Sequence, residues 1–367
     1  MSDLPNAKPK HLLALTGAGI LGAALAVLIG APMPFMVGSL IGSVTFLAFY
    51  ERGHPPMGKM DGRLRMVFVA LIGTMLGTTF SPALLPLLPQ FWLSALAIIP
   101  FILISHAGSF WIMHRLGKYP LVDAYWASMP GGLIEAVLLG EKSGGDVKRL
   151  TAQHFLRIMI IVLTVPLGYF LITGEVVGSA SGQTLSLGEW HGDDLLWIGI
   201  IAPVGLLLGR FLRLPAAHLI GPMALAIVVS VSGILVVDNP QWLLKLAQLG
   251  VGIALGSQFS GISRAMLSTS VAMGFASVAY MLVVALIFAA GLSTLLPASY
   301  IEMFISFAAG GLAEMSLIAL SLNLAPVIVA LHHVIRIVVT VGIGNLIFER
   351  AVKPRIQADL NTASAKS

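Results

Sequence analysis

Two short motifs in this chain combine residue types that bind ions: a Gly-Gly pair, an acid, a histidine and an arginine. Gly131-Gly132-Leu133-Ile134-Glu135 is followed by His154 and Arg157, and the same types recur 179 positions later. A carboxyl group at membrane depth can carry a proton, and a guanidinium group can receive a carboxylate or phosphate. The predicted substrate- or ion-binding residues are Gly131, Gly132, Glu135, His154, Arg157, Gly310, Gly311, Glu314, His333 and Arg336, with Asp123 and Glu302 as secondary candidates.

Each of these residues also has a purely structural interpretation. The glycines would permit close helix crossing. The glutamates would cap helix ends, or Arg157 would pair with Glu135 and Arg336 with Glu314 to lock each broken segment to the following helix. Both kinds of role hold together if the substrate exchanges with the internal acid.

We predict no catalytic residue, no metal and no cofactor, and therefore no enzyme. The chain has no cysteine, which excludes thiolate metal sites, Fe–S clusters and a cysteine nucleophile. His332 and His333 are adjacent on an expected helix, so they point about 100° apart and are poor joint ligands. The other histidine and glutamate spacings indicate no metal site.

The composition indicates an all-α polytopic membrane protein. The chain has 367 residues, of which 57% are hydrophobic and 10% charged, with a mean hydropathy of +0.94. A soluble domain carries about 25% charged residues. A soluble two-domain protein is excluded, because the apolar runs would leave no water-facing surface.

Apolar segments of the length needed to cross a membrane recur along the chain, since a span takes about 20 apolar residues. Twelve segments are predicted, at 11–30, 34–50, 66–80, 88–114, 121–140, 149–173, 194–212, 216–237, 241–259, 266–292, 299–321 and 325–348. Two of them, 121–140 and 299–321, are interrupted by the Gly-Gly pairs, and we expect these to be broken or re-entrant.

The basic residues favour re-entrant segments. With the N-terminus inside, that arrangement places 18 Lys and Arg in the cytoplasm and only Lys245 outside. Twelve full crossings would change the ratio to 13 against 6, and the positive-inside rule prefers the first. The 174–193 loop has three acids, with Asp194 directly after it, and no Lys or Arg, which places it outside the cytoplasm.

Five full crossings per copy require the second copy to be inverted. Inverted repeats around broken helices are a recurrent transporter architecture with a midplane substrate site; a parallel duplication with two kinked helices is the alternative. Gly73 and Gly77, like Gly252 and Gly256, are expected to be helix-packing positions. The predicted organisation is a cytoplasmic tail (1–10), membrane repeat 1 (11–173), an extracytoplasmic linker (174–193), membrane repeat 2 (194–350) and a cytoplasmic tail (351–367).

The run Ser128–Glu135, followed by Gly140-Glu141, Asp146–Arg149 and His154–Arg157, resembles the duplicated bacterial AbrB-type membrane proteins. The resemblance covers essentially all of residues 11–350 and implies a bacterial inner (plasma) membrane protein with cytoplasmic termini. Members of that family are labelled ammonia monooxygenases or regulators of gene expression. The expected halves are also similar in architecture to secondary carboxylate transporters.

Three functions compete. The first is a secondary transporter or exporter of a small anionic metabolite, coupled to protons or sodium. The second is a membrane-embedded regulator that affects gene expression indirectly, and the third is a membrane monooxygenase, for which no ligand cluster is found. The expected partners are the lipid bilayer, a small anionic substrate and a second copy of the chain; no helix-turn-helix or soluble basic domain indicates nucleic-acid binding.

Overall fold

Helices make up nearly all of the regular structure. The computed structural model describes residues 6–80, 86, 89–174, 190–233, 237–262, 264–322 and 324–356. The first helices are α1 (Pro9–Leu28), α2 (Pro34–Tyr50), α3 (Gly62–Thr78), α4 (Trp92–Trp111), the π-helical turn η2 (Ile112–Leu116), α5 (Leu121–Ala127), α6 (Leu133–Lys142) and α7 (Val147–Thr173). The later ones are α8 (Gly192–Phe211), α9 (Ala217–Ser232), α10 (Gln241–Ser257), α11 (Arg264–Ser293), α12 (Tyr300–Phe307), α13 (Leu312–Ser321), α14 (Pro326–Ile347) and the π-helical turn η4 (Phe348–Val352).

The helices agree with the predicted apolar segments, and the prediction of an all-helical multi-pass membrane protein is confirmed. Six helical stretches of the described chain are long and apolar enough to cross a bilayer: Pro9–Leu28, Pro89–Leu116, Val147–Thr173, Gly192–Phe211, Met266–Ser293 and Pro326–Ile356. Most of the predicted 174–193 linker, and the last part of the 351–367 tail, lie outside the described residues.

The two Gly-Gly segments are broken into pairs of short helices, as expected. Pro130 lacks an N–H and disfavours a helical conformation in the residue before it, so the chain leaves α5 after Ala127 and restarts at Leu133. Gly132 begins α6 with φ of +63°, a left-handed conformation that suits glycine. The second segment leaves α12 after Phe307 and restarts beyond Gly311.

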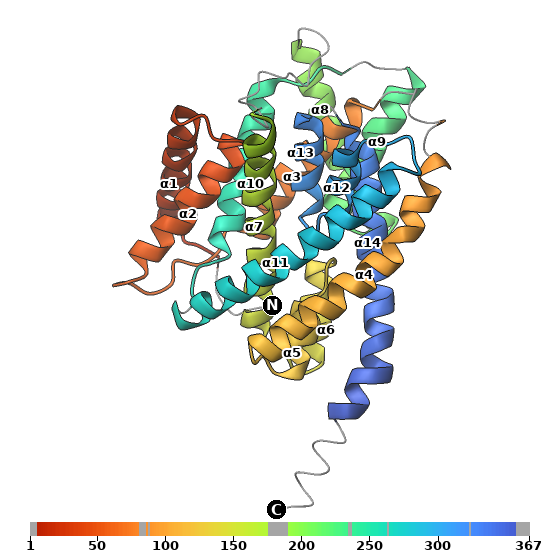
Figure 1. Cartoon of the computed structure of the whole chain (residues 1–367). Coiled ribbons are helices and arrows are strands. Elements are labelled where there is room, and N and C mark those ends of the chain that lie inside the picture. Colours follow the sequence, from red (N-terminus) through yellow and green to blue (C-terminus); the bar gives the residue numbers. More distant parts are fainter. Residues whose placement is uncertain are drawn as a thin grey trace, which may run out of the picture.

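The half-helices lie within the bundle at different heights. Figure 1 shows α5 and α6 folded beside each other at the lower end, and α12 and α13 in the upper half. Within each pair the two half-helices contact each other: α5 contacts α6, and α12 contacts α13. The helix α7 contacts both members of the first pair, and α14 contacts both members of the second. The breaks are therefore placed between the ends of the bundle, where α7 and α14 pass.

Glycines let helices from opposite parts of the chain approach closely. A Cβ at Gly73 on α3 would lie 2.5 Å from the Leu219 carbonyl oxygen on α9, and one at Gly252 on α10 would overlap the Met36 carbonyl oxygen on α2. These positions therefore tolerate only glycine, and their assignment to helix packing is confirmed.

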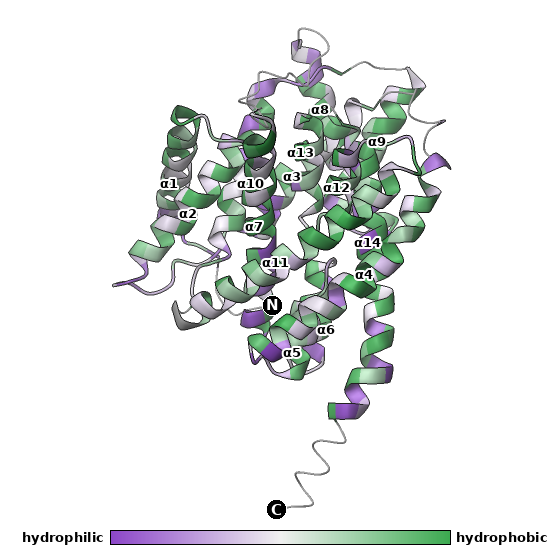
Figure 2. Ribbon diagram, viewed as in Figure 1, coloured by the Kyte–Doolittle hydropathy of each residue, from purple (hydrophilic) through white to green (hydrophobic). Residues whose placement is uncertain are grey.

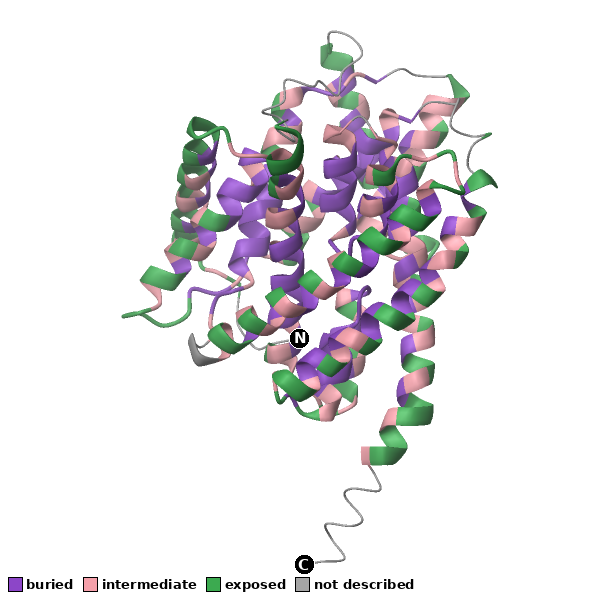
Figure 3. Ribbon diagram, viewed as in Figure 1, coloured by how far each residue is buried: buried purple, intermediate pink, exposed green. Residues whose placement is uncertain are grey.

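The outer surface of the bundle is apolar. Figure 2 shows hydrophobic residues over most of the helical surface, with polar residues gathered toward the helix ends. Figure 3 shows the buried residues concentrated in the central helices, while α1 and the lower end of α14 are largely exposed. Exposed apolar side chains along the long helices, such as Leu28, Ile172 and Phe211, fit a surface solvated by lipid.

Candidate functional site

Arg157 joins α7 to the end of the first half-helix. Its guanidinium group donates to the carbonyl oxygen of Met129, in the break between α5 and α6. A helix C-terminus leaves carbonyls unpaired and carries partial negative charge. Arg157 is buried, so it supplies the donor and the positive charge that the end of α5 lacks.

Arg336 does the same, more completely, for the second break. Its Nη1 donates to the carbonyl oxygens of Phe307 (3.2 Å) and Ala308 (2.8 Å), and its Nη2 donates to that of Gly310 at 3.2 Å. Ala308 is 179 positions after Met129, so the two arginines contact corresponding carbonyls. The break is thus held open by a planar donor fork rather than by helix continuation.

The two breaks pack against helices from the opposite part of the chain. A Cβ at Gly131 would lie 3.2 Å from Thr340 Oγ1 on α14, and one at Gly310 would lie 3.1 Å from Ile161 Cγ2 on α7. Positions 161 and 340 also differ by 179. Arg157 and Arg336 interact electrostatically with each other, so the structure brings both Gly-Gly segments and both arginines to one central region.

Neither arginine forms an ion pair with the motif glutamates in the described part of the chain. The alternative that paired Arg157 with Glu135 and Arg336 with Glu314 is therefore wrong, and the arginines bind carbonyls instead. The physical reason is that a guanidinium group needs acceptors, and the broken half-helices already supply them.

Glu135 and Glu314 lie in the first turns of α6 and α13, the half-helices that follow the two breaks and are called here the returning half-helices. Gly132 and Gly311 precede the first residues of α6 and α13, and the glutamates follow three residues later. A Cβ at Gly132 would lie 3.4 Å from Glu135 Oε2, and one at Gly311 would overlap Glu314 Oε2. A carboxylate at a helix N-terminus is stabilised by the helix dipole and the free N–H groups, so the cap interpretation fits both.

The two histidines line the same region without acting as a pair. His154 Nε2 lies 3.0 Å from the Trp126 carbonyl oxygen of α5, and His333 Nδ1 lies 2.9 Å from the Val329 carbonyl oxygen of its own helix. Among the described residues, the second ring nitrogen of His154 is buried without a hydrogen-bond partner, while the His333 ring also has the Ala308 backbone carbonyl within reach. Buried polar atoms of this kind are uncommon in folded proteins and mark positions that a bound molecule or water can satisfy.

More unpaired polar atoms surround the breaks. Within the described part of the chain, the buried side-chain atoms of this region that lack a close hydrogen-bond partner are Trp126 Nε1, His154 Nδ1, Arg157 Nε, Ser306 Oγ, His333 Nε2, Arg336 Nε and Thr340 Oγ1. Most of them are donors, and the two arginines add positive charge. The region is suited to an anion rather than to a cation.

The secondary candidates Asp123 and Glu302 lie apart from this region, each in the first turn of its half-helix. Asp123 is buried, forms an ion pair with Arg149 and accepts from the Asp146 backbone N–H at 2.8 Å. It ties the start of α5 to the start of α7. Glu302 is half-buried, and its backbone N–H bonds to the Ser299 hydroxyl at 3.1 Å.

Arg65 is a residue that the sequence pattern did not reveal. It lies in the first turn of α3, where it interacts electrostatically with Glu314 and lies 5.8 Å from the centre of the Phe155 ring. Position 244, which corresponds to 65 at the 179-residue offset, is Leu244. The repeat therefore gave no signal for Arg65, and only the packing of α13 on α3 reveals its role.

No group of three or more His, Asp or Glu side chains that could hold a metal occurs in the part of the chain described. The buried histidines bind backbone carbonyls or a serine hydroxyl: His106 bonds to the Tyr125 carbonyl at 3.0 Å, and His332 to Ser94 Oγ at 2.8 Å. Their contacts are those of structural residues between helices.

The chain resembles known bacterial proteins along most of its length. The model of the family described as "AbrB: Transition state regulatory protein AbrB" matches residues 57–351. A Bacillus subtilis (strain 168) protein named "Uncharacterized protein YhjN" is 25% identical over 291 residues, covering 74% of each chain. An Escherichia coli (strain K12) protein named "Putative regulator AbrB" is 25% identical over 190 residues, covering 52% of this chain and 54% of its own length.

The family match spans α3 to η4 and so contains both broken segments, both arginines and both glutamates. These names describe the relatives and contain no substrate. The expected resemblance is confirmed, and the chain is a multi-pass membrane protein that belongs to the AbrB family.

Proposed function

We propose that this chain is a secondary transporter or exporter of a small anionic metabolite, coupled to protons or sodium. The observation that carries the proposal is the pair of helix breaks, each held by a buried arginine and packed onto the helix that holds the other break. Transporters place substrate sites at such breaks, because half-helix ends and freed backbone groups bind ions there.

The helix contacts support a two-fold relation between the two halves, which an inverted repeat requires. Suppose that α1 to α7 correspond in order to α8 to α14. The contact between α2 and α10 then has as its counterpart the contact between α9 and α3, and both contacts occur. In the same way α7 contacts α11 and α14 contacts α4, while α6 contacts α14 and α13 contacts α7. Contacts that exchange between halves create one site from two copies, which is what alternating access from opposite sides requires.

The glutamates supply a mechanism for coupling. Glu135 and Glu314 lie at the N-termini of α6 and α13, the positions where an anionic substrate is bound best. A negative carboxylate and a negative substrate compete there, and protonation of the glutamate removes the competition. Proton binding at one glutamate would thus favour substrate binding at the same half-helix.

Flux measurements on purified protein in liposomes test the proposal. Carboxylates, sulfonates and phosphate esters would be supplied under an imposed proton or sodium gradient. We expect gradient-dependent flux of at least one anion, reduced at least tenfold in the Glu135→Gln, Glu314→Gln double variant. The matched control is Glu349→Gln, which lies in η4 and pairs only with Lys353 in the described residues. Absence of flux for every anion would contradict the proposal.

An indirect regulatory role is the second candidate, because the family description and the Escherichia coli relative carry regulatory names. It needs a partner surface outside the membrane. The 51–60 loop is held down: Glu51 accepts from Met57 N–H, Ser260 Oγ and Gly261 N–H at 3.0, 2.6 and 2.9 Å. The helical end of the chain beyond α14, which projects from the bundle in Figure 1, is the better candidate, and truncating the chain after Val352 tests it. Loss of a transcriptional effect with transport intact would favour regulation.

A further inference from the structure

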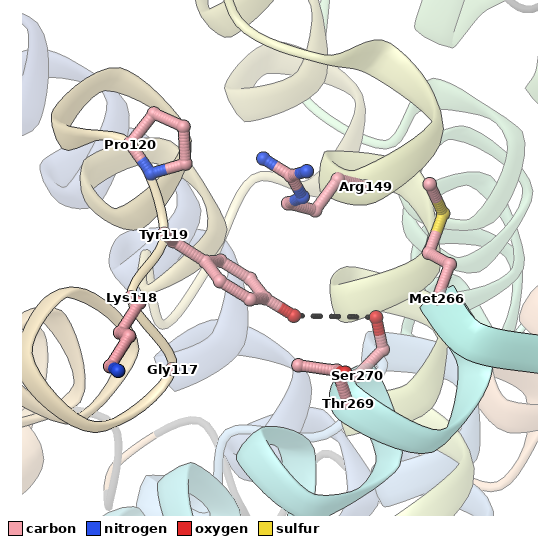
Figure 4. Close-up of a pocket in the computed structure, with 8 residues that line it drawn as sticks. All are labelled: Gly117, Lys118, Tyr119, Pro120, Arg149, Met266, Thr269 and Ser270. Carbon is pink, nitrogen blue, oxygen red and sulfur yellow. Dashed lines mark hydrogen bonds between the residues drawn. The ribbon is translucent and has the colours of Figure 1, made fainter.

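A cavity of about 310 Å³ lies where the end of η2, the start of α5, the start of α7 and the first turns of α11 meet. Figure 4 shows Arg149 and Tyr119 pointing into it, with Lys118 at its rim and Ser270 opposite. Small-molecule sites have cavities of about 300–1,000 Å³. This cavity is separate from the breaks and is large enough for a small metabolite.

The floor of the cavity is a fixed polar network. Tyr119 Oη lies 3.3 Å from Ser270 Oγ and accepts from Gln153 Nε2 at 2.6 Å. The same Nε2 donates to the Ser270 carbonyl oxygen at 3.2 Å. Gln153 is 2% exposed, and its Oε1 is buried with no hydrogen-bond partner in the described residues. Gln153 does not line the cavity itself, since its Oε1 faces α11 at Gly274, where a Cβ would lie 3.7 Å away; its Nε2 fixes Tyr119 and Ser270, which do line it.

The charge of the cavity is positive. Arg149 lies 5.1 Å over the Tyr119 ring and pairs with Asp123, which also accepts from the Asp146 N–H. An arginine has five donors, and Asp123 uses only part of them. No acid lines the cavity among the described residues, so Lys118 leaves a net positive charge at its rim.

Four of the five corresponding positions elsewhere in the chain are apolar; the fifth is His332, which bonds to Ser94 Oγ at 2.8 Å. At an offset of 179, Lys118, Tyr119, Arg149, Gln153 and Ser270 correspond to Pro297, Ala298, Ile328, His332 and Phe91. Phe91 and Ile328 are buried in one hydrophobic cluster, and Ala298 packs against it. The fold is therefore satisfied by an apolar filling at this place, and the polar cavity serves something other than helix packing.

The cavity and the central site lie along the same face of α7. Arg149, Gln153 and Arg157 are spaced four residues apart on α7, so they lie along one face of the helix. Arg149 borders the cavity and Arg157 binds the Met129 carbonyl in the break. Gln153 lies between them along the helix.

We propose that this cavity is a vestibule that binds the carboxylate or phosphate group of the transported anion before the anion reaches the breaks. The inference rests on the proposed function. Lys118 attracts the anion, and the donors of Arg149 that Asp123 does not use, together with the Ser270 hydroxyl, bind its oxygens. The corresponding place in the other half of the chain is filled by Phe91 and Ile328 and has no such site. The anion therefore enters the vestibule from one side of the membrane only.

Calorimetric titration of the full chain in phosphatidylcholine nanodiscs tests this, with citrate and inorganic phosphate as probes. Ser270→Phe places in the cavity the residue found at the corresponding position 91, and we expect it to weaken binding at least tenfold. Lys118→Gln, at the exposed rim, should weaken it about threefold and keeps the test valid if Ser270→Phe fails to fold. Lys142→Gln makes the same charge change at the exposed end of α6, outside the cavity, and should bind like the unaltered chain.

The outcomes separate this proposal from the transport function. Equal binding by Lys118→Gln, Lys142→Gln and the unaltered chain overturns the vestibule, while liposome flux would still support transport. If the Ser270 and Lys118 variants weaken probe binding but the protein moves no anion in liposomes, the cavity is an anion-binding site that does not load a transported substrate. Loss of probe binding when phosphatidylglycerol is added shows that a lipid headgroup occupies the cavity, which also overturns the vestibule.

Discussion

The two broken segments have the same motif and different surroundings. Ile134 in α6 is 54% exposed, whereas Ala313, at the corresponding position in α13, is 6% exposed. Glu135 is half-buried and Glu314 is buried. The second break lies against α3, whereas α5 and α6, which flank the first break, lie toward the lower end of the bundle (Figure 1). One motif therefore occupies two environments within a single structure.

The glycines that begin the returning half-helices differ in conformation as well. Gly132 has φ of +63°, and Gly311 has φ of −78° with an extended ψ of 148°. Hinges are a few residues that absorb large φ/ψ changes between states. The motif thus occurs in two backbone conformations, and under the proposed transport function we expect the two breaks to exchange them.

The largest expected difference concerns the arginines. Arg336→Leu would leave three carbonyls of the α12–α13 break without a donor, and Arg157→Leu would leave one. An unpaired buried polar group costs about 1–3 kcal/mol, so we expect the Arg336 variant to unfold at a clearly lower temperature. Thermal unfolding in detergent, followed by size-exclusion chromatography, measures this.

Arg336→Lys is the control, because it keeps the charge but loses the planar fork. It should unfold at a temperature between those of Arg336→Leu and the unaltered chain. Equal destabilisation by Arg157→Leu and Arg336→Leu would show that the two breaks are held in the same way.

The next largest effect concerns the hinge glycines. Gly132→Ala forces a left-handed residue, which costs about 1–2 kcal/mol, and its Cβ would lie 2.7 Å from Val341 Cγ2. Gly311→Ala keeps an allowed φ and requires only the flexible Glu314 side chain to move. We expect Gly132→Ala to lower thermal stability, and Gly311→Ala to preserve stability but reduce flux at least tenfold.

If stable Gly311→Ala protein shows full flux, the exchange of backbone states is contradicted. That exchange requires residue 311 to adopt the left-handed conformation seen at Gly132, and alanine disfavours this conformation. Gly342→Ala on α14 is a control, since a Cβ there meets no atom within 4 Å. It should change neither stability nor flux.

A smaller effect separates the two glutamates. Glu314 interacts electrostatically with Arg65, and the position that would serve Glu135 holds Leu244. A double-mutant cycle of Arg65→Gln with Glu314→Gln should give a coupling energy of about 0.5–1 kcal/mol in thermal unfolding. The cycle of Arg65→Gln with Glu135→Gln should give none, and similar values for both would mean that Arg65 acts on the two breaks alike.

The sequence predicted the elements better than their contacts. The helices and both breaks were predictable, because apolar length and the helix-breaking chemistry of Gly and Pro are local. The arginine partners were not, since carboxylates and helix-end carbonyls both satisfy a guanidinium group. Arg65 and the cavity formed by Lys118, Arg149 and Ser270 come from distant segments that only the fold brings together.

The difference between the breaks could not be predicted either, because Gly-Gly-Leu-x-Glu is identical in both copies. Their environments follow from the packing of whole helices, such as α13 on α3. Local sequence fixes where the chain breaks, and the arrangement of the two copies fixes how each break is buried.

The side of the membrane reached by each returning half-helix tests the inverted repeat most directly. Ser143 and Leu322 are the C-cap residues of α6 and α13 and lie 179 positions apart. The chain has no cysteine, so Ser143→Cys and Leu322→Cys can be labelled singly with a membrane-impermeant maleimide on intact cells and on inverted vesicles. We predict labelling of Ser143→Cys from the cytoplasmic side and of Leu322→Cys from the opposite side; labelling of both from the same side would contradict the inverted arrangement.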